Sequence, residues 1–108
     1  MNHQVRLTAE AEGDLLAIGR YVTRHDGLAR AEWLLAQLQE ACVTLAAFPD
    51  RGHVPPELER VAVFDYREIH WKPYRVVYQV AGRRVYVHAV LDGRRSLQEL
   101  LERRLLQR

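Results

Sequence analysis

The stretch from Tyr66 to Arg95 constrains the fold most strongly, because apolar and polar residues alternate along most of its length. In residues 74–80, alternation points four side chains one way and Arg75, Val77 and Gln79 the other way. The first group consists of Tyr74, Val76, Tyr78 and Val80. A glycine-containing turn at 81–84 leads into a second alternating run, and residues 66–71 precede both as a third strand-like segment. The pattern predicts two adjacent β-hairpins.

The second alternating run places Val85, Val87, Ala89 and Leu91 on one side of its strand. The two hairpins are expected to bring together the arginines of this segment, namely Arg67, Arg75, Arg94 and Arg95. Residues 60–108 carry eleven basic residues against five acidic ones, whereas residues 1–59 carry five against nine. A basic sheet predicts a polyanionic or acidic partner. The marked preference for arginine over lysine fits bidentate phosphate or carboxylate contacts, but a GC-rich genome explains it equally well.

The first half of the chain predicts a strand followed by two helices. Residues 3–7 are strand-like, and Thr8 is a suitable N-cap for a helix that ends at Asp26–Gly27. A second helix is expected from about Leu28 to Phe48, where Pro49 ends it. Both helices have one apolar face, and the tight turn between them predicts an antiparallel helical hairpin.

The remaining segments complete the predicted order β-α-α-β-β-β-α. Residues 57–65 are interpreted as a connector, and Ser96 as the cap of a final leucine-rich helix. The expected fold is one α+β domain over residues 1–108, with an antiparallel sheet and the helical hairpin packed on one of its faces. The other face, bearing Arg75, Val77 and Gln79, is expected to be open to solvent.

Several classes of protein are excluded by composition. The single cysteine, Cys42, excludes an internal disulfide and a multi-cysteine zinc site. No apolar run approaches the roughly 18 residues of a membrane span, and no signal peptide is recognisable, so a cytoplasmic protein is expected. The five histidines show no metal-ligand spacing, and neither a metal nor a cofactor is predicted. His70 and His88 are candidate catalytic bases, but both are expected to be structural histidines.

Five short motifs occur in an order and spacing typical of one family. They are Leu7–Ala11, Phe48–Gly52, Tyr66–Ile69, Tyr74–Tyr78 and Val90–Arg95. Over essentially its whole length the chain resembles the RelE/ParE superfamily, the toxins of bacterial type II toxin–antitoxin pairs. Asp92 is a departure, because many members have histidine there. The fold of that superfamily agrees with the one predicted from the residues.

The resemblance implies a partner, a small DNA-binding antitoxin of the ParD or RelB kind that neutralises the toxin in a hetero-oligomer. A flexible acidic partner would gain apolar burial and arginine pairs as it orders. The antitoxin-binding residues expected are Leu97, Leu101, Leu105 and Trp71. Alternatively, the three leucines pack on the sheet of this chain. Both arrangements can hold in turn if the antitoxin displaces the helix.

The resemblance also leaves two activities open, with a third possibility of a non-toxic interaction module. RelE-like members are ribosome-dependent endoribonucleases, for which Arg75, Arg94 and Arg95 would be the catalytic residues. However, the chain lacks the C-terminal Tyr or His and the paired lysines of those members. ParE-like members poison DNA gyrase and need no acid–base set, so the chain would not be an enzyme. Gyrase is the favoured target, with Arg67, Arg75, Arg94 and Arg95 as the target-binding residues.

Overall fold

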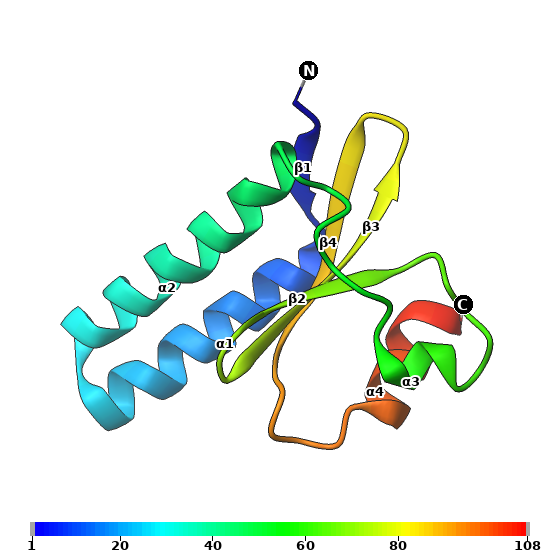
Figure 1. Cartoon of the computed structure of the whole chain (residues 1–108). Helices are drawn as coiled ribbons and strands as arrows, with labels where there is room; N and C mark the ends of the chain where they lie inside the picture. Colours follow the sequence, from blue (N-terminus) through cyan, green and yellow to red (C-terminus); the bar gives the residue numbers. More distant parts are fainter. Residues whose placement is uncertain (1, 108) are drawn as a thin grey trace.

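The computed structural model describes residues 2–107 and contains one four-stranded sheet with helices on both faces (Figure 1). The strands are β1 (Gln4–Leu7), β2 (Arg67–Trp71), β3 (Tyr74–Ala81) and β4 (Arg84–Asp92). The helices are α1 (Ala9–Asp26), α2 (Leu28–Val43), α3 (Pro56–Glu59) and α4 (Gln98–Leu106), with a 3₁₀ turn at Thr44–Ala46. The predicted α+β class and the predicted order β-α-α-β-β-β-α are confirmed, with α3 as an addition inside the expected connector.

The sheet has the strand order β1-β4-β3-β2. The three strands of the Tyr66–Arg95 stretch pair antiparallel, as their hairpin turns require, while β1 joins the edge of β4 in parallel. The parallel pairing is possible because β1 and β4 are far apart in sequence, with the helices α1 to α3 and the strands β2 and β3 between them. The most central strands, β3 and β4, therefore carry most of the core.

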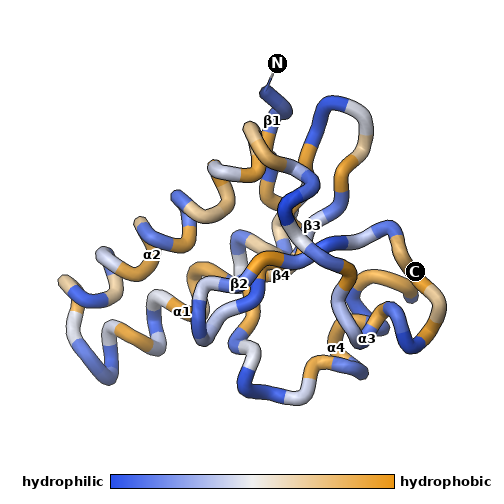
Figure 2. Tube along the Cα trace, viewed as in Figure 1, coloured by the Kyte–Doolittle hydropathy of each residue, from blue (hydrophilic) through white to orange (hydrophobic). Residues whose placement is uncertain are grey.

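The helical hairpin forms where the sequence predicts it. The Thr8 hydroxyl accepts a hydrogen bond from the Ala11 amide at 3.1 Å, which satisfies one free donor of the first turn of α1. Gly27 joins the two helices with φ +94°, a conformation that costs glycine little. Apolar and polar residues alternate along both helices (Figure 2), and their apolar faces pack on Val76, Tyr78, Val85 and Val87.

A β-bulge in β4 changes which residues face the hairpin. Val77 pairs with Ala89 but its neighbour Tyr78 pairs with Val87, so His88 is the extra, unpaired residue. Val87 therefore points toward the helical hairpin, whereas Ala89 and Leu91 point to the opposite face. The predicted grouping of Val85, Val87, Ala89 and Leu91 on one side is wrong, because simple alternation carries no signal for an inserted residue.

The opposite face of the sheet is covered, and the prediction of an open face is wrong. Leu97, Leu101 and Leu105 of the last helical segment are buried there against Val77 and Ala89. Leu58 of α3 and Leu91 complete this second core. Figure 1 shows α3 and α4 together on the side of the sheet away from the α1–α2 hairpin. The leucines of the C-terminal helix thus pack on their own sheet, the second of the two arrangements that the sequence allowed.

An ion pair between α4 and α1 holds α4 in this position. Arg104 forms a bidentate ion pair with Asp14 of α1, at 2.6 and 3.0 Å, and both side chains are largely buried. Asp14 also accepts a hydrogen bond from the Val90 amide at 2.9 Å. The predicted cap at Ser96 is wrong, because α4 starts after Leu97 and no side chain caps its first turn. Burial of the leucines therefore compensates for an uncapped helix start.

We expect Leu101→Ala to lower the free energy of unfolding by about 2–5 kcal/mol, because the fully buried side chain leaves a cavity between α4 and the sheet. Chemical denaturation measures this loss. The matched control is Leu106→Ala on the exposed side of the same helix, which should change stability much less. Equal, small losses for both variants would contradict the packing of α4 on the sheet.

Candidate functional site

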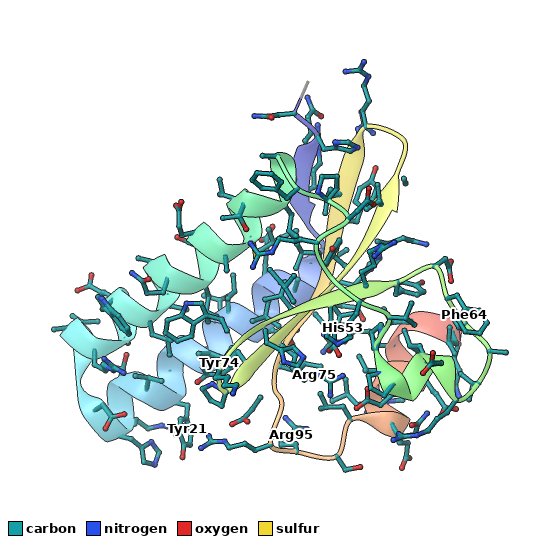
Figure 3. All side chains as sticks on the ribbon, viewed as in Figure 1. Tyr21, His53, Phe64, Tyr74, Arg75 and Arg95 are labelled. Carbon is teal, nitrogen blue, oxygen red and sulfur yellow. The ribbon has the colours of Figure 1, made fainter. Side chains whose placement is uncertain are left out.

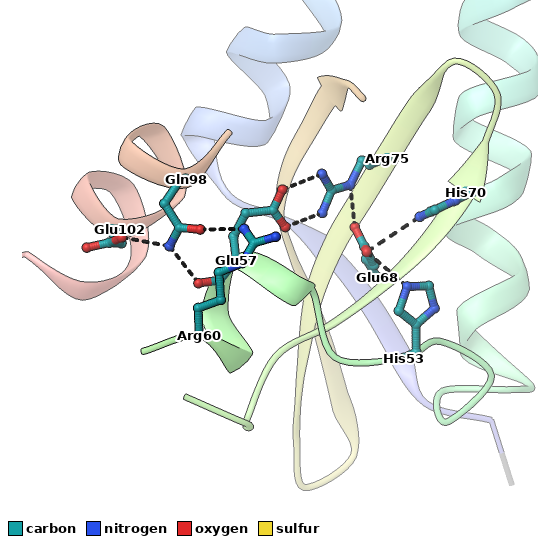
Figure 4. A network of polar contacts seen from close by, with 8 residues as sticks. All are labelled: His53, Glu57, Arg60, Glu68, His70, Arg75, Gln98 and Glu102. Carbon is teal, nitrogen blue, oxygen red and sulfur yellow. Dashed lines mark hydrogen bonds and ion pairs between the residues drawn. The ribbon is translucent and has the colours of Figure 1, made fainter. Parts of the chain in front are cut away.

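Arg75 lies at the centre of a largely buried ion-pair cluster, which comprises Arg75, Glu57, Glu68, His53 and His70 (Figure 4). Its Nη1 and Nη2 donate to the two carboxylate oxygens of Glu57 at 2.8 and 2.6 Å. Its Nε donates to Glu68 Oε1 at 2.6 Å. These are short, charge-assisted contacts, and the Arg75–Glu57 pair has the bidentate geometry that suits a guanidinium.

The electrostatics of the cluster follow from these contacts. Hydrogen bonds from Arg75 lower the pKa of Glu57, and the same pair raises the pKa of Arg75. Arg75 is thus permanently charged, and each of its three nitrogens already donates to a carboxylate. With two carboxylates for one guanidinium, this part of the cluster has a net negative charge. It would repel a phosphate rather than bind one.

Glu68 is the most buried member of the cluster, with 1% of its side chain exposed. Its second oxygen, Oε2, lies 2.9 Å from His53 Nε2 and 3.4 Å from His70 Nε2. Glu68 and His70 share one face of β2 with Arg75, which pairs with His70 across the β2–β3 ladder. His70 therefore lies beside Arg75 and on the opposite face of β2 from Arg67.

The cluster extends from the sheet to the last helix. Gln98 of α4 donates from Nε2 to the Glu57 carbonyl oxygen at 2.7 Å, and its Oε1 accepts from Arg60 at 2.9 Å. Gln98 also donates to Glu102 at 2.7 Å. Figure 4 shows this chain of contacts running from α4 through α3 to β3 and β2. Three segments that are distant in sequence are therefore held together by polar contacts.

Arg67 lies on the opposite face of the sheet from Arg75, so the four predicted arginines do not form one cluster. It pairs with Tyr78 on the opposite face of the sheet from Arg75. There its guanidinium donates to the carbonyl oxygens of Gly52 at 2.7 Å and Asp50 at 3.3 Å. These contacts assign Arg67 a structural role, since they hold the turn after α2 against the sheet.

Arg94 and Arg95 are the predicted arginines that are exposed, at the end of β4. They line a pocket of about 390 Å³ together with Tyr21, Tyr74 and Asp92. Arg94 forms an ion pair with Asp92 at 2.7 Å, and its hydrogen bonds lower the pKa of Asp92. Arg95 lies beside Tyr21 below Tyr74 (Figure 3). Cationic and aromatic side chains together are typical of a protein-binding surface.

The predicted antitoxin-binding residues fall in two places. Leu97, Leu101 and Leu105 are buried in the second core and are not accessible while α4 is in place. Trp71 lies on the other face, partly exposed, where it contacts Trp33 of α2 edge to face at 5.8 Å. Only Trp71 is therefore available for a partner in this conformation.

Sequence reasoning missed an apolar groove between β1, α1 and α2. Its volume is about 480 Å³, and it is lined by Leu7, Glu12, Leu15, Leu16, Leu35 and Gln39. Leu16 is 60% exposed at this groove. The signal was present in the sequence, because Leu16 adds a second apolar residue beside the core position Leu15.

The remaining candidates are structural. Burial raises the pKa of the Cys42 thiol to about 11, as expected for an unreactive core cysteine. Burial lowers the pKa of His88, which contacts Tyr66 edge to face and lies 3.4 Å from Gln79 Oε1. Within residues 2–107, no helix is both long enough and apolar enough to cross a membrane.

The same fold occurs in solved chains of two toxin–antitoxin systems. The chain superposes on a chain of the chromosomal ParDE system from P. aeruginosa with a TM-score of 0.71 and 18% identity, over 83% of this chain and 95% of that one. It also resembles a chain of the RelBE2 toxin–antitoxin complex from Mycobacterium tuberculosis, with a TM-score of 0.61 and 20% identity, over 85% and 99% of the two chains.

Comparison with the sequences of known proteins identifies the family to which this chain belongs. The chain is 35% identical over 103 residues to toxin ParE of Escherichia coli, covering 92% of this chain and 93% of that protein. It is 31% identical over 94 residues to toxin ParE3 of Caulobacter vibrioides, covering 83% and 86%. Residues 5–97 match the family described as the ParE toxin of the type II toxin–antitoxin system parDE. The chain belongs to this ParE toxin family, as the sequence motifs predicted.

The lowered pKa of Glu57 predicts how the cluster responds to acid. Above the ordinary glutamate pKa of about 4.3, the paired Glu57 carboxylate stabilises the fold, and this stabilisation is lost as the pH falls through the lowered pKa. We therefore expect Glu57→Gln to destabilise the protein at neutral pH. The difference in free energy of unfolding from the wild type should shrink in acid.

Denaturation of both proteins from pH 7 downward measures this difference. Glu59→Gln, which changes an exposed residue two positions away, is the matched control and should cost little at any pH. A Glu57→Gln difference that stays constant down to strongly acidic pH would contradict the ion pair.

Proposed function

We propose that this ParE-family toxin inhibits bacterial growth by poisoning DNA gyrase, and that it acts as a binding protein rather than as an enzyme. The observation that supports this is that one of the predicted arginines is paired inside the fold, whereas two others are exposed. Arg75, which an RNA-cleaving relative would use on phosphate, is occupied by Glu57 and Glu68. Arg94 and Arg95 are exposed beside Tyr21 and Tyr74. Such a surface suits contact with an acidic patch on a protein target in the cytoplasm.

The proposed target surface is thus the end of β4 and the adjoining loop, not the sheet face. Arg94 is held by Asp92, which stands at the position where many superfamily members have histidine. This pair orients one guanidinium, while Arg95 remains next to the pocket. Of the four arginines predicted to bind the target, we retain these two, because Arg67 and Arg75 are engaged in internal contacts.

A second candidate function is ribosome-dependent cleavage of mRNA, and one observation favours it. His53 and His70 lie within 3.4 Å of the Glu68 carboxylate, next to Arg75. Imidazole and carboxylate groups in one cluster are the groups used for general acid–base chemistry. Arg75, Glu57 and Glu68 together carry a net negative charge, which opposes phosphate binding at this cluster. We therefore prefer gyrase as the target. A non-toxic interaction module is the third possibility.

We further propose that a cognate antitoxin docks in the apolar groove between β1, α1 and α2. The two solved relatives described above come from toxin–antitoxin complexes, which supports an antitoxin partner. An amphipathic segment would place apolar residues against Leu16 and Leu35, with α4 left in place. Displacement of α4 would instead require loss of its leucine core and of the Arg104–Asp14 pair.

Purified protein should increase the amount of cleaved DNA in a gyrase reaction. Replacing both Arg94 and Arg95 by alanine should raise the concentration needed by about tenfold or more, because arginines at the centre of an interface contribute strongly to affinity. The matched control is Arg6→Ala with Arg84→Ala, which removes the same charge from exposed residues at the other end of the sheet.

Each outcome of this experiment selects one function. Loss of activity only in the Arg94 and Arg95 variant supports the proposed surface. No effect of the wild type on gyrase, together with cutting of mRNA on ribosomes, would replace gyrase by the RNase candidate. No effect in either reaction, and harmless expression without the antitoxin, would leave the interaction module.

The antitoxin proposal predicts that Leu16→Glu weakens antitoxin binding by about tenfold or more, because it places a charge in an apolar contact. Isothermal titration with the antitoxin measures the change. Leu28→Glu is the matched control, since it alters an equally exposed leucine at the hairpin turn. If Leu16→Glu leaves the affinity for the antitoxin unchanged while variants that loosen α4 reduce it, docking on the sheet is indicated instead.

A further inference from the structure

Three side chains of the ion-pair cluster converge on one point at the protein surface. One possible ligand atom from each of Glu68, His53 and His70 lies within 4.8 Å of the other two. The carboxylate is buried, while 60% of the His53 side chain and 46% of the His70 side chain are exposed. The three possible ligand atoms therefore form a small open triangle that a solvated ion can reach.

The backbone fixes this arrangement without help from a ligand. His53 and Glu68 form an isolated antiparallel bridge, in which each amide donates to the carbonyl of the other at 3.1 and 2.7 Å. His70 is two residues further along β2, so it shares a face with Glu68. The turn before His53 is held as well, because the Gly52 amide donates to the Tyr78 hydroxyl, which itself donates to Pro49 O.

Gly52 shows how closely this turn approaches the sheet. A β-carbon at this position would lie 2.5 Å from the Glu68 carbonyl oxygen and 2.7 Å from the Tyr78 hydroxyl, so only glycine fits. The distances between the side chains are thus set by packed backbone, which is the rigidity that a preorganised ligand set needs.

The side-chain distances suit a tetrahedral ion. Zinc bound at about 2.0–2.1 Å in tetrahedral geometry separates its ligand atoms by about 3.3 Å. The Glu68–His70 separation is 3.4 Å, and the Glu68–His53 separation is 2.9 Å. The Glu68–His70 separation matches this value, and the Glu68–His53 separation reaches it after a small outward movement of the exposed His53 ring. Two imidazoles and one carboxylate are also a donor set that zinc commonly takes, with the fourth position left to water.

The rest of the cluster acts as the support that metal ligands usually have. Arg75 donates to Oε1 of Glu68 and is held in turn by Glu57, so that Oε2 is directed toward the histidines. Second contacts of this kind orient a carboxylate and increase metal affinity. The combined charge of Glu57, Glu68 and Arg75 is negative, which favours a cation between the imidazoles.

From this geometry we propose that His53, Glu68 and His70 form a binding site for Zn²⁺. The ligands stand fifteen and two residues apart along the chain, so no regular ligand spacing marks this site in the sequence. The bound ion links the segment before α3 to β2, and so it would stabilise the side of the sheet that α3 and α4 cover. The proposal is independent of the target of the toxin.

Isothermal titration of the protein with Zn²⁺, without a histidine tag and after treatment with a chelator, tests this site. We expect one ion per chain for the wild type. His53→Gln and His70→Gln should each weaken binding by roughly tenfold or more, because each removes one of three ligands. His25→Gln changes an exposed histidine on α1 and is the matched control that should keep wild-type affinity.

A thermal melt provides a second readout that a general loss of folding would not imitate. Zinc at about 100 times its dissociation constant should raise the melting temperature of the wild type and of His25→Gln by roughly 10 °C or more. The two ligand variants should melt like the metal-free wild type and show little shift. Absence of stoichiometric zinc binding in the wild type would overturn the proposal, as would unchanged affinity in both His53→Gln and His70→Gln.

Discussion

The packing of α3 and α4 on the sheet depends on the ion pairs of Arg75. A guanidinium and two carboxylates are removed from most of the solvent, and this is favourable only because each nitrogen of Arg75 donates to a carboxylate oxygen. Glu57 brings α3 to the sheet, and Gln98 then connects α3 to α4. Loss of one member would leave a buried charge without its partner, so this cluster specifies where the last helix packs.

Because Arg75 is paired inside the fold, the face of the sheet that carries it differs in role from the exposed surfaces. The covered side contains charges that compensate one another, and its leucine core belongs to the fold itself. The exposed elements lie elsewhere, at the end of β4, where Arg94 and Arg95 adjoin two tyrosines, and at the groove of the helical hairpin. Separate surfaces would allow one toxin to meet a target and an antitoxin through different contacts.

Much of the fold follows from local patterns, while most of the site does not. The Thr8 cap, the Gly27 turn and the alternation in β3 are properties of single elements, and each could be predicted from neighbouring residues. The bulge at His88 reverses the faces of Ala89 and Leu91 without any change in composition. Likewise, Arg75 acquires its partner Glu57 through packing of a segment eighteen residues away. Sequence alone could not distinguish an arginine that binds phosphate from one that holds the fold together.

We propose above that this ParE-family chain, with an internally paired Arg75, acts on DNA gyrase and not on mRNA. The most direct test is to induce the chain alone in bacteria and to follow DNA and protein synthesis separately by pulse labelling. The account predicts that DNA synthesis falls first and that cells form filaments with a DNA-damage response. An earlier arrest of translation, with mRNA cut on ribosomes, would contradict it and indicate a catalytic role for Arg75 and the neighbouring histidines.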